Sequence, residues 1–517
     1  MSRPNNFVIL GGGISGLSAA WYLSRHVPST TKITILEGSN RFGGWIKSKR
    51  VGEHKILFEQ GPRTLRPNGI GGPVVLDMAS CFVINKLNLT SSLHAVTKND
   101  DASKNRYIYY PDRLVKLPGS SLLSSLKSVM INKFLLKTAS SILLEPFVKS
   151  SKNYEDESIH EFISRRFDKS VSDILISALI HGIYAGDVKK LSVKSIFTRL
   201  YDLEQRHGSV IKGLLMGNKE AFLCQQDKDL LKIVNDENKE LLAIMKDVSL
   251  YSFKDGIEQL PSAIVNDLKN RENVQLKTDN QVIKLEFGKK IKISTNDGVY
   301  EADHIISTIP SRELSHILPD KGTIPHLDYN PSVSVATINI AYNHPKILPV
   351  KGFGYLIPQS TPNNPYHILG VVFDSDAMPL QDEPPRTYTK LTVMIGGHYF
   401  NSISGKVDFP NKDILLQQSM EILEKHLGIY STPLYYLVDI HKNCIPQYYV
   451  GHYSRLEELH YAIKKYYPNQ LSVTGASYWG VSINDCVLNS AKLVLNLLSN
   501  SSNVVTGLER IDTKFRL

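Results

Sequence analysis

Short apolar runs near the start of the chain predict a βαβ unit. Residues 7–10 form one unbroken apolar run, and residues 33–36 form a second run that is apolar except for Thr34. Runs without alternation are typical of strands that are buried on both faces of a parallel sheet. Between them, apolar residues repeat at helical spacing over residues 16–25. The pattern therefore predicts a strand, a helix and a parallel strand within about thirty residues.

The rest of the pattern predicts further strands and one helical segment. Residues 113–144 are apolar and basic without any acidic residue, and helical spacing resumes over residues 159–215. Short alternating runs over residues 273–300 predict antiparallel strands. Later runs predict strands over residues 302–310, 332–342 and 387–397, and a final apolar helix over residues 486–498. We therefore expect a mixed α/β (α+β) protein with a helical insertion.

Composition and charge narrow the classes of partner. The chain has 517 residues, of which 42% are hydrophobic and 21% charged, and its net charge is +10. This fits a globular protein of about three domains with anionic partners. The basic residues are spread along the chain rather than gathered in a tail, so no nucleic-acid partner is expected. No long apolar run predicts a membrane-spanning helix, and the first strand starts too close to Met1 for a conventional presequence.

The four cysteines carry no metal or disulfide pattern. They lie far apart and form no Cys-x-x-Cys pair, at Cys81, Cys224, Cys444 and Cys486. This spacing argues against a disulfide framework and against a zinc or iron–sulfur site. No metal is expected.

A glycine-rich turn after the first strand carries the sharpest chemical signal. It fits Gly-x-Gly-x-x-Gly between a predicted strand and helix, which is the context that indicates a dinucleotide site. The glycines permit a tight turn, close approach to a pyrophosphate and close helix packing, and the free N–H groups at the helix start attract phosphate. The residues expected to bind the cofactor here are Gly11, Gly12, Gly13, Ile14, Ser15 and Gly16.

The second strand ends on an acid that suits the ribose of an adenosine half. A carboxylate at Glu37 accepts hydrogen bonds from both ribose hydroxyls and disfavours a 2′-phosphate, so NADP is not expected. The next residues read Glu-x-x-x-Arg-x-Gly-Gly, with Arg41, Gly43 and Gly44. This extension resembles the pattern of the GDI-like flavoprotein superfamily and favours FAD over NAD. Arg41 is expected to neutralise phosphate charge, and the two glycines to permit close backbone approach.

Residues 475–485 form a second small-residue turn, which leads into the last predicted helix. Amides at such a helix start can face the anionic edge of a flavin ring. Residues 475–480 contain no cysteine, so a thioether bond to the flavin has no candidate there. We expect one FAD per chain, bound without a covalent link.

Several motifs extend a resemblance over nearly the whole chain. GGGISGL is shared with many flavoproteins, whereas the combination of FEQGPR, HGIYAGD, GFGYL and HKNCIPQY is far more specific. On these motifs the chain resembles the protoporphyrinogen oxidase family. The resemblance implies a discontinuous Rossmann-like FAD domain, a β-rich substrate domain and a helical membrane-binding insertion. The implied segments are 1–95, 250–312 and 455–517 for FAD binding, 96–112, 216–249 and 313–454 for the substrate, and 113–215 for the insertion.

The resemblance also implies an activity. It is the oxygen-dependent, six-electron oxidation of protoporphyrinogen IX to protoporphyrin IX, the penultimate step of heme biosynthesis, with hydride transfer to FAD and release of hydrogen peroxide. The sequence identifies no catalytic acid or base. Two alternatives remain open: another FAD-dependent amine oxidase or desaturase, and a GDI-like binding protein without enzymatic activity.

Residue roles follow from the resemblance alone. Arg106 matches the family's propionate-binding arginine, although without the family it would be read as a surface residue. The other residues implied for the substrate pocket are Gly182, Phe353, Gly354, Leu356, Leu369 and Met394. Further FAD contacts are implied at Gly61, Pro62, Arg63, Val282, Ala476, Val481, Ser482 and Ile483.

The basic segment 113–144 suits the surface of an anionic bilayer. The resemblance implies peripheral attachment to the mitochondrial inner membrane on its intermembrane-space side, and it leaves room for a homodimer and for contact with a ferrochelatase. The alternative for this segment is an amphipathic helix packed on the core.

Overall fold

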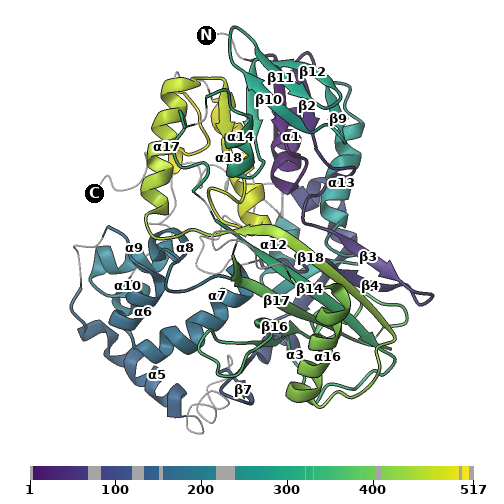
Figure 1. Cartoon of the computed structure of the whole chain (residues 1–517), viewed down its shortest axis with the longest axis vertical. Helices are drawn as coiled ribbons and strands as arrows, with labels where there is room; N and C mark the ends of the chain where they lie inside the picture. The colour runs from purple at the N-terminus through teal and green to yellow at the C-terminus, as the bar shows by residue number, and fades with distance from the viewer. Residues whose placement is uncertain are drawn as a thin grey trace.

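The computed structural model describes residues 4–67, 83–118, 133–150, 155–216, 239–320, 322–329, 331–385, 387–401, 409–499 and 504–511. Within these ranges the chain forms a parallel sheet flanked by helices, a large mixed sheet and a helical segment (Figure 1). The mixed α/β class predicted from the hydrophobic pattern is confirmed.

The parallel sheet is assembled from distant parts of the chain. Its central strand is β1 (Asn6–Leu10), with β2 (Lys32–Leu36) on one side and β13 (His304–Ser307) on the other. The outer strands are β9 (Val274–Lys277) and β19 (Leu471–Val473). Segments from the start, middle and end of the chain therefore build one discontinuous Rossmann-like domain, as predicted. The exact segment limits stay predictions.

One strand prediction is wrong in its pairing. β9 lies parallel to β2 at the edge of this sheet rather than in an antiparallel group. Only the following strands are antiparallel: β10 (Val282–Glu286), β11 (Ile291–Thr295) and β12 (Gly298–Ala302). A short alternating run sets which side chains are buried but does not identify the partner strand.

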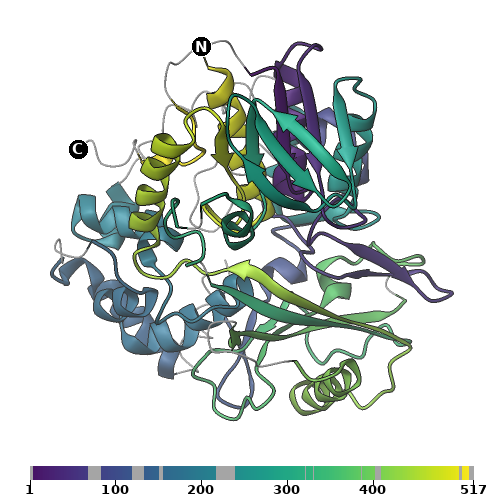
Figure 2. The same ribbon diagram turned by 45° about the horizontal axis from the view of Figure 1, so that its top comes forward.

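Helices from both chain ends pack together on this domain. The helix α1 (Ile14–His26) contacts α18 (Ile483–Leu498) and α13 (Gln259–Lys269), and Figure 2 shows the first and last helices beside the parallel strands. Leu17, Trp21 and Val487 are fully buried between them. The other side of the domain carries α14 (Ser311–Ile317), α17 (His452–Tyr466) and η6 (Glu509–Ile511).

The large sheet has seven strands and is covered by α16 (Lys412–Leu427). Its long strands are β14 (Ser332–Tyr342), β17 (Thr389–Asn401) and β18 (Tyr435–Pro446). The shorter ones are β16 (Ile368–Val372), β15 (Gly354–Leu356), β6 (Tyr107–Tyr109) and β7 (Leu114–Lys116). The connecting elements are β3 (Ser48–Val51), β4 (Ile56–Glu59), β5 (Leu93–Thr97), β8 (Val248–Phe253), η1 (Leu89–Ser92), α3 (Asp101–Lys104), α12 (Lys239–Met245) and α15 (Asp374–Ala377).

The helical segment consists of short helices rather than one long region. They are α5 (Lys133–Leu144), η2 (Glu145–Phe147), α6 (Ile159–Arg166), η3 (Val171–Ile176), α7 (Ser177–Tyr184), α8 (Val193–Ile196), α9 (Thr198–His207) and α10 (Val210–Met216). Buried Arg166 pairs with Glu145 and Glu204 at its centre. In the ranges given above, every helix is too short or too polar to cross a bilayer.

Candidate functional site

The first glycine turn has the geometry that a dinucleotide needs. Gly11 adopts a φ of +98°, which favours glycine, and Gly13 precedes α1 without any side chain capping the helix start. A Cβ at Gly16 would overlap the carbonyl oxygen of Gly11, whereas one at Gly13 would meet nothing closer than 3.9 Å. The turn is therefore packed on its inner side and open at Gly13, where the first N–H groups of the helix are free to hold phosphate.

The second glycine pair lies directly on the first turn. Gly43 donates an N–H hydrogen bond of 2.9 Å to the Gly12 carbonyl. A Cβ at Gly44 would come within 3.1 Å of the Gly13 Cα, and Gly44 has a φ of +58°. Two backbone segments without side chains therefore meet at the helix start, and both motifs predicted to hold the cofactor converge there.

Glu37 lies beside the same turn. Its carboxylate accepts hydrogen bonds from the N–H groups of Gly12 at 2.7 Å and Ser39 at 2.8 Å. Its carbonyl accepts one of 2.9 Å from Asn280, two residues before Val282. Val282 and Glu37 are thus brought to one end of the site, the end expected for the adenosine half.

Arg41 is engaged by the protein itself. Its guanidinium donates to the carbonyl oxygens of Gly44 at 2.7 Å and Ile46 at 2.6 Å, and it forms an ion pair of 2.8 Å with Glu258. This arrangement holds the glycine loop in position. Glu258 already offsets the positive charge of Arg41. Direct neutralisation of phosphate by Arg41 stays a prediction.

The C-terminal turn reaches the first helix. Gly475 has a φ of +105°, and a Cβ there would lie 3.3 Å from Ser15 Oγ. Ser482 caps α18 through a reciprocal pair of hydrogen bonds with Asp485. The remaining predicted contacts flank this cap: the Ala476 carbonyl accepts from the Tyr448 hydroxyl, Val481 packs on the helical segment, and Ile483 is buried in the core.

The Gly-Pro-Arg segment connects the two halves of the molecule. A Cβ at Gly61 would overlap the Trp45 carbonyl oxygen, so only glycine fits there. After Pro62, Arg63 forms an ion pair of 2.8 Å with Asp374 of α15. Trp45 is half exposed despite its size. We did not identify it as a site residue from the sequence, although its place directly after Gly43-Gly44 is a signal that could have indicated it. Contacts of these residues with FAD stay predictions.

These observations fit FAD. The free N–H groups of α1 and the open face of Gly13 suit a diphosphate, and Glu37 suits a ribose. The Gly475 turn and the start of α18 lie on the same side, where they can approach the flavin end. No group of His, Cys, Asp and Glu suited to a metal ion occurs among the residues whose positions are described.

Four of the residues predicted for the substrate pocket come together at the border between the helical segment and the large sheet. A Cβ at Gly182 of α7 would come within 2.9 Å of the Leu356 side chain. Leu369 and Met394 pack in one apolar cluster with Ala185, which follows α7. Gly354 has a φ of +130° in β15. The structure thus brings Gly182, Leu356, Leu369 and Met394 to adjoining apolar surfaces.

Phe353 lies on another apolar cluster, and its backbone contacts the residue before Arg106. Phe353 packs with Leu250 and Met378 rather than with Leu369. Its N–H donates a hydrogen bond of 3.1 Å to the Asn105 carbonyl, beside Arg106, which is exposed. The substrate residues therefore form two groups, one apolar and one that carries a cation.

A histidine pair adjoins the apolar group, and we did not identify it from the sequence. His181 Nδ1–H donates to the Ile357 carbonyl at 2.6 Å, so its Nε2 accepts from His398 Nε2–H at 3.0 Å. Burial lowers the pKa of both rings. The pair joins α7 to β17 as neutral groups beside Gly182.

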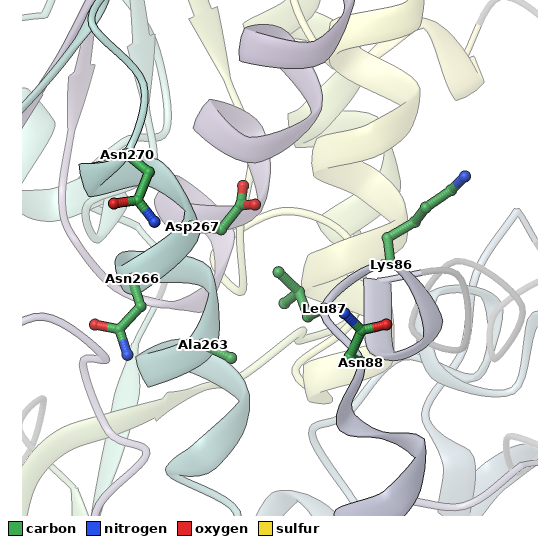
Figure 3. Close-up of a pocket in the computed structure, with 7 residues that line it drawn as sticks. All are labelled: Lys86, Leu87, Asn88, Ala263, Asn266, Asp267 and Asn270. Atoms are coloured by element: carbon green, nitrogen blue, oxygen red, sulfur yellow. The ribbon is translucent and has the colours of Figure 1, made fainter.

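A surface cavity of about 320 Å³ lies elsewhere, between α13 and residues 86–88 (Figure 3). Its wall includes Asn266 and Asp267, and Asp267 pairs with Arg25 at the far end of α1 from the glycine turn. This cavity is therefore separate from the nucleotide site.

Comparisons with known proteins agree with this geometry. Residues 14–493 match the family model described as flavin containing amine oxidoreductase. The chain is 37% identical over 510 residues to the protoporphyrinogen oxidase of Schizosaccharomyces pombe, covering 96% of this chain and 100% of that one. It is 34% identical to the human protoporphyrinogen oxidase, covering 96% and 99%.

A solved structure supports the fold. The putative protoporphyrinogen oxidase of Exiguobacterium sp. 255-15 superposes with a TM-score of 0.74 at 21% identity, covering 96% of this chain and 98% of that chain. Together, these matches and the converging glycine turns show that the chain is an FAD-dependent oxidase. It belongs to the flavin containing amine oxidoreductases and, within them, to the protoporphyrinogen oxidase family.

Proposed function

We propose that the chain oxidises protoporphyrinogen to protoporphyrin, with O₂ as the final electron acceptor and hydrogen peroxide as the second product. The observation that carries this proposal is the convergence of the Gly11–Gly16 turn and the Gly475 turn, and we assign the apolar cluster that contains Leu369 and Met394 to the substrate side. The relatives that match over nearly the full chain are named for this substrate.

The proposed cofactor is one FAD per chain, held without a covalent bond. Bound flavin supplies the redox chemistry, and the protein supplies binding and orientation. Of the two cysteines described, Cys486 is buried in α18, and burial raises its pKa and that of Cys444 to about 12. Both thiols are therefore protonated and poorly nucleophilic at neutral pH, which supports non-covalent binding.

The residues around the proposed pocket suit an apolar ring with little charge. Leu356, Leu369 and Met394 supply apolar surface, and the missing side chain of Gly182 lets Leu356 pack directly against α7. Burial raises the pKa of Tyr399 to about 12, so this hydroxyl is neutral like the histidines next to it. These residues thus orient and desolvate the apolar ring of the substrate. The carboxylate arms of the substrate need a cation outside this apolar group.

A substrate panel tests the proposal. Purified protein loaded with FAD is mixed in air with protoporphyrinogen, a polyamine or phytoene, and oxygen uptake and porphyrin fluorescence are followed. We expect oxygen uptake with protoporphyrinogen, with porphyrin and peroxide formed together. Faster uptake with the polyamine or with phytoene would assign the chain to another branch of the superfamily.

We further propose that the helical segment binds the surface of the mitochondrial inner membrane from the intermembrane space. Large apolar side chains are exposed where α5, η2 and α10 meet, with Phe147 at 85% and Leu215 at 82%. Neighbouring Leu143, Leu144 and Met216 are exposed as well. Such a patch beside basic residues suits an anionic bilayer.

Vesicle binding tests this location. Lys127 lies outside the described residues, as does the side chain of Lys133, and Lys137 pairs with Asp168 at 3.0 Å. We expect Phe147→Ser with Leu215→Ser, and separately Lys127→Glu with Lys133→Glu and Lys137→Glu, to release the protein from cardiolipin-rich vesicles. Unchanged co-sedimentation of both variants would reject the proposal. A homodimer and a ferrochelatase contact stay predictions of the resemblance.

A further inference from the structure

A second arginine has its backbone fixed between the two halves of the site. Arg66 follows Leu65, which exchanges backbone hydrogen bonds of 2.7 and 2.8 Å with Tyr251 of β8. The Arg66 carbonyl accepts a hydrogen bond of 3.1 Å from Asn484 Nδ2, in the first turn of α18. Arg66 is therefore tied to β8 and to the helix start that we assign to the flavin end.

Arg106 lies directly before β6 of the large sheet, and its neighbour Asn105 contacts the same region. The carbonyl of its neighbour Asn105 accepts the hydrogen bond from Phe353 N–H, at 3.1 Å. Phe353 packs on Leu250 of β8, directly before Tyr251. One small apolar cluster thus lies between the anchor points of the two arginines.

The positive charges of Arg66 and Arg106 repel each other, and among the described residues neither side chain has a carboxylate partner. Burial, and after it the positive charge of Arg106, lowers the pKa of Arg66 to about 10. Arg63 in the same loop has a carboxylate partner, Asp374 at 2.8 Å. Across the described ranges, no carboxylate pairs with Arg66 or Arg106. A pair of repelling cations is stabilised by an anion that binds both.

We propose that Arg66 and Arg106 together bind one carboxylate arm of the substrate, with Arg66 as the specificity-determining contact. This inference rests on the proposed function, in which the substrate carries carboxylates on flexible arms. Guanidinium groups bind carboxylates through paired, charge-assisted hydrogen bonds, and Arg66 keeps part of its surface accessible to a ligand. Because Arg66 is tied to α18, a carboxylate held there is fixed relative to the cofactor end.

Binding of a diacid and its ester tests the inference without turnover. FAD-loaded protein is titrated with protoporphyrin IX and with its dimethyl ester, and porphyrin fluorescence is followed. We expect Arg66→Gln to weaken diacid binding by about tenfold or more and to leave ester binding and FAD affinity unchanged. Arg312→Gln, at an exposed arginine of α14, is the matched control and should bind both porphyrins like the wild type.

Three outcomes of the Arg66→Gln titration would overturn the inference. The first is wild-type diacid binding by Arg66→Gln, and the second is equal loss of diacid and ester. The third is loss of FAD affinity with the diacid preference intact, which would assign Arg66 to the diphosphate. If Arg66→Gln does not fold, Arg66→Lys replaces it in the test, because lysine keeps the positive charge but cannot donate the paired hydrogen bonds of a guanidinium group. An unchanged preference of Arg66→Lys for the diacid over the ester would then overturn the inference. Failure of the wild type to oxidise protoporphyrinogen is a separate result, which rejects the proposed function.

Discussion

Gly475 lies directly against Ser15, so the turn before the last helix touches the first turn of the first helix. A Cβ at Gly475 would come 3.3 Å from Ser15 Oγ and 3.4 Å from the Thr308 carbonyl. Ser490 of α18 strengthens this contact with a hydrogen bond of 2.9 Å to the Ser15 carbonyl. Two turns from opposite ends of the chain therefore form one site for one cofactor.

We expect Gly475→Ala to weaken FAD binding by about tenfold, because a φ of +105° strains an alanine by about 1–2 kcal/mol and its Cβ presses on Ser15. Flavin fluorescence titration measures the affinity. Gly428→Ala is the matched control, since Gly428 also has a positive φ but a Cβ there meets nothing within 4 Å. Equal loss of FAD affinity in both variants would show that the effect is general strain.

The Arg41–Glu258 pair should act on FAD as a unit. Glu258→Gln leaves the Arg41 guanidinium without its carboxylate, so the loop carrying Gly44 loses its fixed position and FAD affinity falls. Arg41→Lys removes the paired bonds to Gly44 and Ile46 and should have a larger effect. We expect the double variant to lose less FAD affinity than the sum of both changes. Strictly additive losses would mean that the two residues act independently.

Buried His304 should make the fold sensitive to acid. Burial lowers its pKa to about 4, and its Nδ1–H donates to the Asn469 carbonyl at 2.8 Å. In the unfolded chain the pKa returns to about 6.5, so the unfolded state binds more protons between these values. This contribution to stability is complete above about pH 6.5 and is lost toward pH 4, at about 1.4 kcal/mol per pH unit.

Urea unfolding at a series of pH values measures this dependence. His304→Asn should be less stable at pH 7.5, and its midpoint should fall less steeply than that of the wild type between about pH 6.5 and 4. His316→Asn changes an exposed histidine of α14 and should keep the wild-type slope. An unchanged slope in His304→Asn would contradict the assignment.

The His181–His398 pair should set the position of α7 beside the pocket. His398→Phe leaves His181 Nε2 without its donor, which shifts the Gly182 surface relative to Leu356. We expect the KM for protoporphyrinogen to rise about tenfold, a loss of about 1.4 kcal/mol, with little change in kcat or FAD affinity. His398→Gln, which can still donate a hydrogen bond, should restore much of the KM. A fall in kcat alone would argue for a role in the chemical step.

Local patterns in the sequence were enough to find the parts of the nucleotide site. The Gly11–Gly16 turn and Glu37 have fixed spacing because one βαβ unit positions them, and β14 covers residues 332–342, as predicted from the run of residues there. Contacts between distant segments could not be found in this way. Glu258 beside Arg41 and His398 beside His181 depend on how separate elements pack, and no spacing in the sequence records that packing.

The most direct measurement is an anaerobic mixture of FAD-loaded protein with protoporphyrinogen, followed by visible absorption. If the account is correct, the flavin band bleaches, porphyrin bands appear, and admission of air restores the flavin band. A bound flavin that keeps its absorption in the presence of protoporphyrinogen would contradict the account, as would a purified protein that binds no FAD.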